Sequence, residues 1–227
     1  MNENKISYKN MYLFSAAIIG IMAALAAWAW MQLPAGQGIP VHWNAAGEAD
    51  RFGSKFEGLI LLPLITAGVT LLLAIVPRIS PKGENIQRSG TAYMAVWGAT
   101  LLLMLAIYVA GLADIFGWVT NPMGKIAQTA LAFFLIVMGN YMGKIRHNYM
   151  FGVRTPWTIA SEQSWNKTHR ITGRLWVVVG LLTLATAWFL SGSLSVYLLL
   201  IGMLGSTAFA MIYSYIVWKN DPTLQTQ

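Results

Sequence analysis

The chain has 227 residues, 56% hydrophobic and 10% charged, and its mean hydropathy of +0.55 excludes an ordinary soluble domain and predicts an integral membrane protein. The net charge of +7 comes without a recognition helix or a soluble basic domain, so we expect no direct contact with nucleic acid. The absence of cysteine excludes disulfides, thiolate metal sites and a cysteine nucleophile.

Six apolar segments are long enough to cross a bilayer, because a spanning helix needs about 20 mostly apolar residues. They are residues 11–33, 58–77, 91–113, 125–143, 173–191 and 194–218. An SGS turn at 191–193 separates the last two. We therefore predict an all-α bundle of six transmembrane helices that forms one domain over residues 1–227, with no separate catalytic domain.

Lysine and arginine predict the orientation, because short cytoplasmic loops are enriched in these residues. Of the 15, only Arg51, Lys55 and Lys125 would lie on one side of the predicted bundle. We therefore expect both termini to be cytoplasmic and the protein to lie in a cell membrane. This asymmetry accounts for the basic composition, and anionic membrane lipids are expected neighbours.

The outward loop, residues 34–57, is one candidate site. His42, Trp43 and Asn44 combine a titratable ring, a large amphipathic surface and an amide, which suit the binding of a peptide or a lipid headgroup. The alternative is that Trp43 only anchors a solvated loop at the membrane interface.

Asn140 is the most polar residue within the predicted spans. It lies inside the sequence Gly139-Asn140-Tyr141-Met142-Gly143, which has small residues four positions apart. This spacing is typical of closely packed membrane helices. We expect Asn140 to form an amide hydrogen bond at such an interface rather than to mark a transport site.

The inward polar segment, residues 144–172, is the main candidate site, because polar residues near a bilayer are costly without partners. We expect Thr158 to cap a short amphipathic helix here. Glu162, Trp165, His169 and Gly173 fall at i, i+3, i+7 and i+11 and would line one side of it.

Asn148, Arg154 and Thr155 precede this helix in a turn-like stretch. Arg154 is expected to pair with Glu162, with a carboxylate of another loop, or with a lipid phosphate. The alternative for the whole segment is an interfacial helix that only braces the bundle.

A membrane enzyme or a transporter acting on a lipid or small molecule is the alternative class of function. Its candidate groups would be His42, Asp114, Asn140, Glu162 and His169. Across the predicted membrane, His42 would lie about 30 Å from the inward histidines, so they cannot share a metal. His147, His169 and Glu162 remain an alternative metal set, although no HExxH-type spacing is present. We assign no catalytic residue, metal or cofactor.

The sequence GNYMGKIRHNYMFGVRTPWTIASEQSWNKTHRITG resembles the signature of the SdpI-type immunity proteins of bacteria. The resemblance includes Asn148, the block from Gly152 to Thr158, and the spacing of Glu162, Trp165 and His169. The outward Pro40-Val41-His42-Trp43-Asn44 resembles the domain of unknown function that often precedes this signature.

The resemblance implies a multi-pass membrane protein that protects its host against a secreted peptide toxin. It also implies a receptor that holds a cytoplasmic transcriptional repressor at the membrane. A toxin would most naturally contact the outward loop, and a cytoplasmic signalling partner residues 154–174. The candidate ligand- or partner-binding residues are His42, Trp43, Asn44, Asn140, Asn148, Arg154, Thr155, Trp157, Glu162, Trp165 and His169.

Overall fold

The computed structural model describes residues 8–190 and 192–224. Its elements are α1 (Lys9–Gln32), β1 (Ile39–Trp43), β2 (Ala49–Gly53), the π-helical turn η1 (Phe56–Ile60), α2 (Leu61–Ile79), α3 (Gly83–Arg88), α4 (Gly90–Ile115), the π-helical turn η2 (Met123–Ala127), α5 (Gln128–Met142), α6 (Pro156–Ala160), α7 (Glu162–Phe189), α8 (Gly192–Lys219) and the 3₁₀ turn η3 (Pro222–Leu224). Six helical stretches of the described residues are long and apolar enough to cross a membrane. The predicted helical, multi-pass fold is therefore confirmed.

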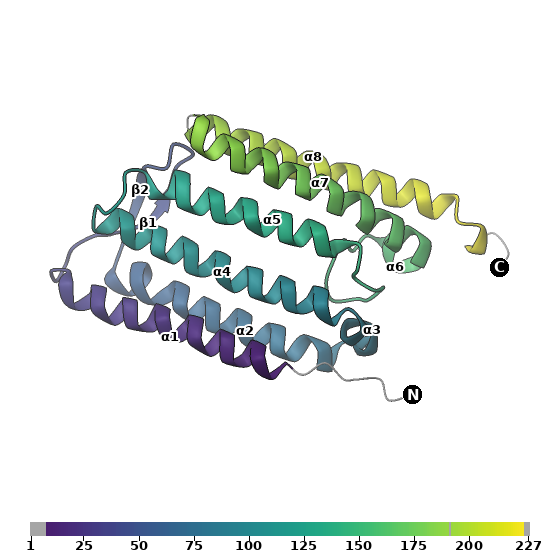
Figure 1. The fold of residues 1–227 in the computed structure, drawn as a ribbon, viewed down its shortest axis with the longest axis horizontal. Coiled ribbons are helices and arrows are strands. Elements are labelled where there is room, and N and C mark those ends of the chain that lie inside the picture. Colours follow the sequence, from purple (N-terminus) through teal and green to yellow (C-terminus); the bar gives the residue numbers. More distant parts are fainter. Residues whose placement is uncertain (1–7, 191, 225–227) are drawn as a thin grey trace.

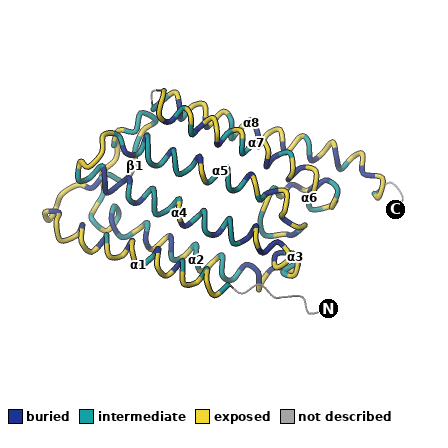
Figure 2. The backbone as a smooth tube through the Cα atoms, in the orientation of Figure 1, coloured by how far each residue is buried: buried dark blue, intermediate teal, exposed yellow. Residues whose placement is uncertain are grey.

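The long helices lie roughly parallel in two groups of three (Figure 1). The first group contains α1, α2 and α4, the second contains α5, α7 and α8, and α4 packs against α5 to join them. The first group buries Trp97 and Leu101 of α4 completely, and the Trp97 indole N–H donates to Ser15 Oγ on α1 at 3.1 Å. Exposed positions recur along the outer helices α1 and α8 (Figure 2), as expected for surfaces that meet lipid.

The second group depends on glycines where α5 and α7 meet. A Cβ atom built on Gly173 would lie 2.5 Å from the Gly139 carbonyl oxygen, and one built on Gly180 would lie 2.8 Å from the Ala132 carbonyl oxygen. The two backbones can approach this closely only without side chains at these positions. The close packing expected near Asn140 is present, but the expected amide bond is not: the exposed Asn140 side chain bonds to no other described residue.

The fifth spanning helix begins at Glu162 rather than near residue 173. Ser161, not Thr158, is its N-cap, and the Ser161 hydroxyl accepts the Ser164 backbone N–H at 2.9 Å. The predicted amphipathic helix is thus the first part of α7, because its polar residues find partners in the loop beside it. Residue 191, the predicted end of this span, lies outside the described residues.

The two ends of the bundle differ in structure. One end carries the antiparallel hairpin β1–β2, formed within the segment predicted as the outward loop. The other carries α3, α6, the start of α1 and the end of α8 (Figure 1). Arg51, Lys55 and Lys125 lie toward the hairpin end, so the lysine and arginine asymmetry runs along the bundle axis. A cytoplasmic position for the α3–α6 end remains a prediction.

Candidate functional site

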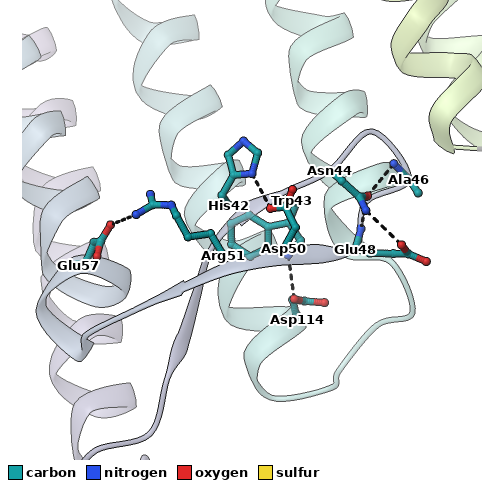
Figure 3. A network of polar contacts seen from close by, with 9 residues as sticks. All are labelled: His42, Trp43, Asn44, Ala46, Glu48, Asp50, Arg51, Glu57 and Asp114. Carbon is teal, nitrogen blue, oxygen red and sulfur yellow. Dashed lines mark hydrogen bonds and ion pairs between the residues drawn. The ribbon is translucent and has the colours of Figure 1, made fainter.

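The hairpin is attached to the bundle through Trp43. Its indole Nε1–H donates to Asp114 Oδ2 at 2.9 Å, which joins β1 to the last turn of α4 (Figure 3). Lys55 Nζ donates to the carbonyl oxygens of Trp30 and Leu33 at the end of α1. The hairpin is therefore held from two helices of the first group.

The other two residues of the predicted outward cluster have different roles. The exposed His42 ring places Nδ1 2.6 Å from Asp50 Oδ1 on the paired strand. Asn44 Oδ1 accepts the backbone N–H groups of Ala46 and Glu48 at 2.9 and 3.1 Å and so shapes the turn. Figure 3 shows the three side chains engaging separate partners, so they do not converge on one ligand position.

A cavity of about 280 Å³ lies under the hairpin, between α2 and α4. Trp43 reaches into its wall, and Arg51 and Glu57 form an ion pair of 2.6 Å among its lining residues. The remaining lining is almost entirely apolar: Pro40, Val41, Gly58, Leu61, Leu62, Ile65, Ile107, Tyr108, Gly111, Leu112 and Ile115. The cavity can accept an apolar side chain beside a pair of opposite charges.

At the opposite end, a buried group of aromatic rings is centred on Trp165. The Trp165 ring stacks on His169 with centroids 4.1 Å apart and contacts the His147 ring at 5.1 Å. The Trp165 indole N–H donates to the Ile145 carbonyl at 2.8 Å. Trp165 and His169 are no more than 1% exposed, so both act inside the protein rather than on its surface.

Hydrogen bonds assign opposite tautomers to the two histidines. His169 Nε2 must accept the Val153 backbone N–H, 3.0 Å away, and its Nδ1–H donates to the Trp165 carbonyl at 2.8 Å. His147 Nε2–H donates to the Ile159 carbonyl at 3.0 Å, which leaves Nδ1 to accept from Lys82 Nζ at 3.1 Å. Burial, and then the Lys82 charge, lowers the pKa of His147.

Asn148 organises the loop that covers these rings. Its fully buried side chain accepts the backbone N–H groups of Met150 and Phe151 and donates to the carbonyls of Arg146 and Phe151. Gly152 follows with φ of +112°, and a Cβ atom there would collide with His169 Nε2. The glycine permits the bond from Val153 to His169.

A hydroxyl network that the sequence analysis did not identify joins α6 and α7 to α8. Thr155, the N-cap of α6, places its Oγ1 2.9 Å from Ser214 Oγ, and Ser164 Oγ donates to the Ser214 carbonyl at 2.8 Å. Ser161 donates to the Asp221 carboxylate, which also accepts from Thr223.

The Ser161 bond, followed by the Thr223 bonds, lowers the pKa of Asp221. The spacing of Ser161 and Ser164 is a capping signal in the sequence, but no local pattern points to α8.

Several predicted site residues lie on the surface instead. Glu162 is exposed, so it does not join the buried Trp165 and His169. Arg154 forms no ion pair with Glu162 and donates to the Tyr149 carbonyl at 3.0 Å. Trp157, by contrast, is half-buried and packs edge-on against Tyr215 of α8, with ring centroids 5.2 Å apart.

The four residues of the predicted face share one side of α7, as predicted, but Glu162 is exposed while Trp165 and His169 are buried. Helical spacing gives angular position along a helix, but not where neighbouring elements end.

Within the described ranges, no three His, Asp or Glu side chains gather where they could hold a metal ion. The alternative set of His147, His169 and Glu162 is not assembled, since Trp165 contacts both rings and Glu162 lies in solvent. Both nitrogens of each histidine ring are already engaged by protein groups.

Comparisons with known proteins place matches in both groups of helices. Residues 144–214 match the SdpI/YfhL protein family, and residues 17–67 match the Domain of unknown function (DUF1648). Immunity protein SdpI of Bacillus subtilis (strain 168) is 23% identical over 184 residues, which cover 80% of this chain and 84% of that protein. No solved structure matches significantly. These matches confirm that the chain is a multi-pass membrane protein that resembles the SdpI-type immunity proteins over most of its length.

Proposed function

We propose that this chain is a membrane immunity protein that protects a bacterial cell by binding a secreted antimicrobial peptide at its hairpin end. The observation that carries the proposal is the similarity to Immunity protein SdpI over 80% of the chain, which spans both groups of helices.

The cavity under the hairpin supports this location for peptide binding. Its apolar floor suits a leucine-sized or aromatic side chain, and burying such a side chain is worth about 1.5–3 kcal/mol. The Arg51–Glu57 pair offers both a donor and an acceptor to a peptide backbone or to charged residues beside the buried one.

The hairpin is also preorganised, which lowers the entropy cost of binding. Trp43 is bonded to Asp114, and the Tyr108 hydroxyl donates to the Leu59 carbonyl at 3.0 Å below the hairpin. Ile39 of β1 is fully buried, and Gly58 gives it room, because a Cβ there would overlap the Ile39 side chain. In this proposal His42 and Asn44 maintain the hairpin, and the cavity beside Trp43 takes the peptide.

Signalling to a cytoplasmic partner, such as a repressor, belongs to the same proposal. It would use the exposed side chains near the start of α7, including Arg154 and Glu162. Trp165, His169 and Asn148 are buried, so they would act by holding this surface in place rather than by touching the partner.

The test is survival of a peptide-sensitive bacterium that expresses the chain, challenged with a panel of secreted antimicrobial peptides. Ile65→Trp narrows the cavity from α2. Leu64→Trp is the matched control, since Leu64 is similarly exposed on the same helix but does not line this cavity. We expect Ile65→Trp to lower the inhibitory concentration of the relevant peptide at least about tenfold, toward that of cells without the protein.

Leu64→Trp at equal membrane levels should protect like the wild type. No protection by the wild-type chain against any peptide in the panel would reject the immunity role and favour handling of a lipid or small molecule. Equal protection by both variants would reject the cavity as the binding site.

A further inference from the structure

Two adjoining hollows lie between α4, α5 and α7. Figure 1 shows these helices running to the end of the bundle that carries α3 and α6. The first has a volume of about 450 Å³ and is formed by the start of α4, residues 143–146 and α7. The second, about 460 Å³, continues along α5 and α7. Both are lined by Gly143 and Arg170, so they form one extended groove, which we call the basic groove.

The groove concentrates positive charge. Arg88, Lys144, Arg146 and Arg170 line its first part, and Arg174 joins Arg170 in the second. No aspartate or glutamate lines either part. The ion pairs formed among residues 8–190 and 192–224 are His42–Asp50 and Arg51–Glu57, so none neutralises Lys144, Arg146 or Arg170. Such a set of like charges favours a bound anion.

The backbone around these cations is fixed by the fold. The Arg146 backbone N–H donates to Ser89 Oγ at 2.8 Å, which attaches the 143–146 segment to the start of α4. Gly143 lets the Arg170 stem lie against the end of α5, because a Cβ there would be 3.2 Å from Arg170 Cγ. The cations are therefore presented from three connected elements rather than scattered over a flexible surface.

The second part of the groove adds an apolar surface. Gly139 and Gly173 remove side chains between α5 and α7, and Val177 and Val178 continue the wall toward the middle of the helix. Asn140 lies beside this wall with an unbonded amide. A ligand that fills the groove would place an anionic group among the arginines and an apolar chain along the valines.

We propose that the basic groove binds an anionic phospholipid, with its phosphate held by Arg146 and Arg170 and an acyl chain lying along Val177 and Val178. Arginine guanidinium groups donate two parallel hydrogen bonds to phosphate oxygens, and basic recesses between membrane helices suit anionic headgroups. A free phosphate would satisfy the cations but leave the apolar wall unused. The site is separate from the hairpin cavity, so it does not rest on the proposed immunity function.

The experiment is native mass spectrometry of the full chain in detergent, titrated with phosphatidylglycerol, with phosphatidylcholine of the same acyl chains, and with soluble glycerol 3-phosphate. The wild-type chain should retain phosphatidylglycerol at least about tenfold more strongly than phosphatidylcholine. The variant with both Arg146→Gln and Arg170→Gln should lose about tenfold or more of that affinity. Arg78→Gln is the matched control, because it removes an exposed arginine of α2 that lines neither hollow.

Four outcomes would overturn the proposal. They are equal retention of the two lipids, equal loss in Arg78→Gln, unchanged binding in the double variant, and displacement of the lipid by millimolar glycerol 3-phosphate, which would assign the groove to a small anion. If the double variant does not accumulate, Lys144→Gln alone should weaken phosphatidylglycerol binding about threefold, and no change there would equally reject the site.

Discussion

His169 accepts the backbone N–H of Val153 through Nε2 at 3.0 Å, and this bond joins the loop before α6 to the interior of α7. The same ring stacks on Trp165 and donates to its carbonyl. A single side chain thus fixes the loop, the helix and the aromatic group in one arrangement. Trp165 and His169, two residues of the sequence motif, therefore hold the exposed surface around them in place.

His169→Ala should destabilise the protein by about 2–4 kcal/mol, because it leaves the half-buried Val153 N–H unpaired and opens a cavity beside Trp165. Thermal unfolding of the purified protein in detergent measures the effect. Glu162→Ala, at an exposed position of the same helix, is the control and should change stability by no more than about 0.5 kcal/mol. Similar losses in both variants would contradict a supporting role specific to His169.

Gly152→Ala tests the backbone conformation of the loop. Gly152 has φ of +112°, and a Cβ atom there would also collide with His169 Nε2, so we expect a loss of about 2–3 kcal/mol. Gly117→Ala separates the two causes: its φ is +66°, but nothing lies within 4 Å of its Cβ position, and about 1 kcal/mol is expected. If the two variants unfold at the same temperature, the contact with His169 contributes nothing.

Gly173→Ala should weaken the packing of α5 on α7. The new Cβ would lie 2.5 Å from the Gly139 carbonyl oxygen, so the helices must separate, at a cost of about 1–3 kcal/mol. Gly205→Ala in α8 is the matched control, because nothing lies within 4 Å of its Cβ position and alanine favours the helix. Denaturant unfolding in detergent compares them, and a loss in Gly205→Ala as large as in Gly173→Ala would refute the packing argument.

Asp221 should make stability depend on pH. Its pKa is lowered in the folded protein by the Ser161 and Thr223 hydrogen bonds, so its contribution is present above the ordinary aspartate pKa of 3.8. The contribution is lost as pH falls through the lower, folded pKa. We therefore expect the unfolding temperature of the wild type to fall more steeply below about pH 4 than that of Asp221→Asn.

Parallel pH profiles for the two proteins would show that the carboxylate contributes nothing there. Ser161→Ala should reduce the pH dependence as well, because it removes the hydrogen bond that contributes most to the lowered pKa of Asp221.

The amino-acid sequence by itself determined the class of the protein and its membrane-spanning segments. A run of about 20 apolar residues can be identified without knowing what packs against it. In lipid such a run must form its backbone hydrogen bonds within itself, as a helix does. The glycine spacing around Asn140 likewise predicted close packing of α5, because small residues act through the backbone that carries them. The motif from Asn148 to His169 was enough to indicate the SdpI-type resemblance.

Only the tertiary structure decided which polar residues meet. Helical spacing placed Glu162 beside Trp165 and His169, but Glu162 lies where no element covers α7. The outward hairpin is attached to the bundle because Trp43 bonds to Asp114, 71 residues away, and no local pattern contains that bond. Likewise, Asp221 meets Ser161 and Ser214 meets Thr155 only because α8 packs on α6 and α7. The packing of the helices determines which residues this far apart in the sequence meet, and a local sequence pattern carries no information about that packing.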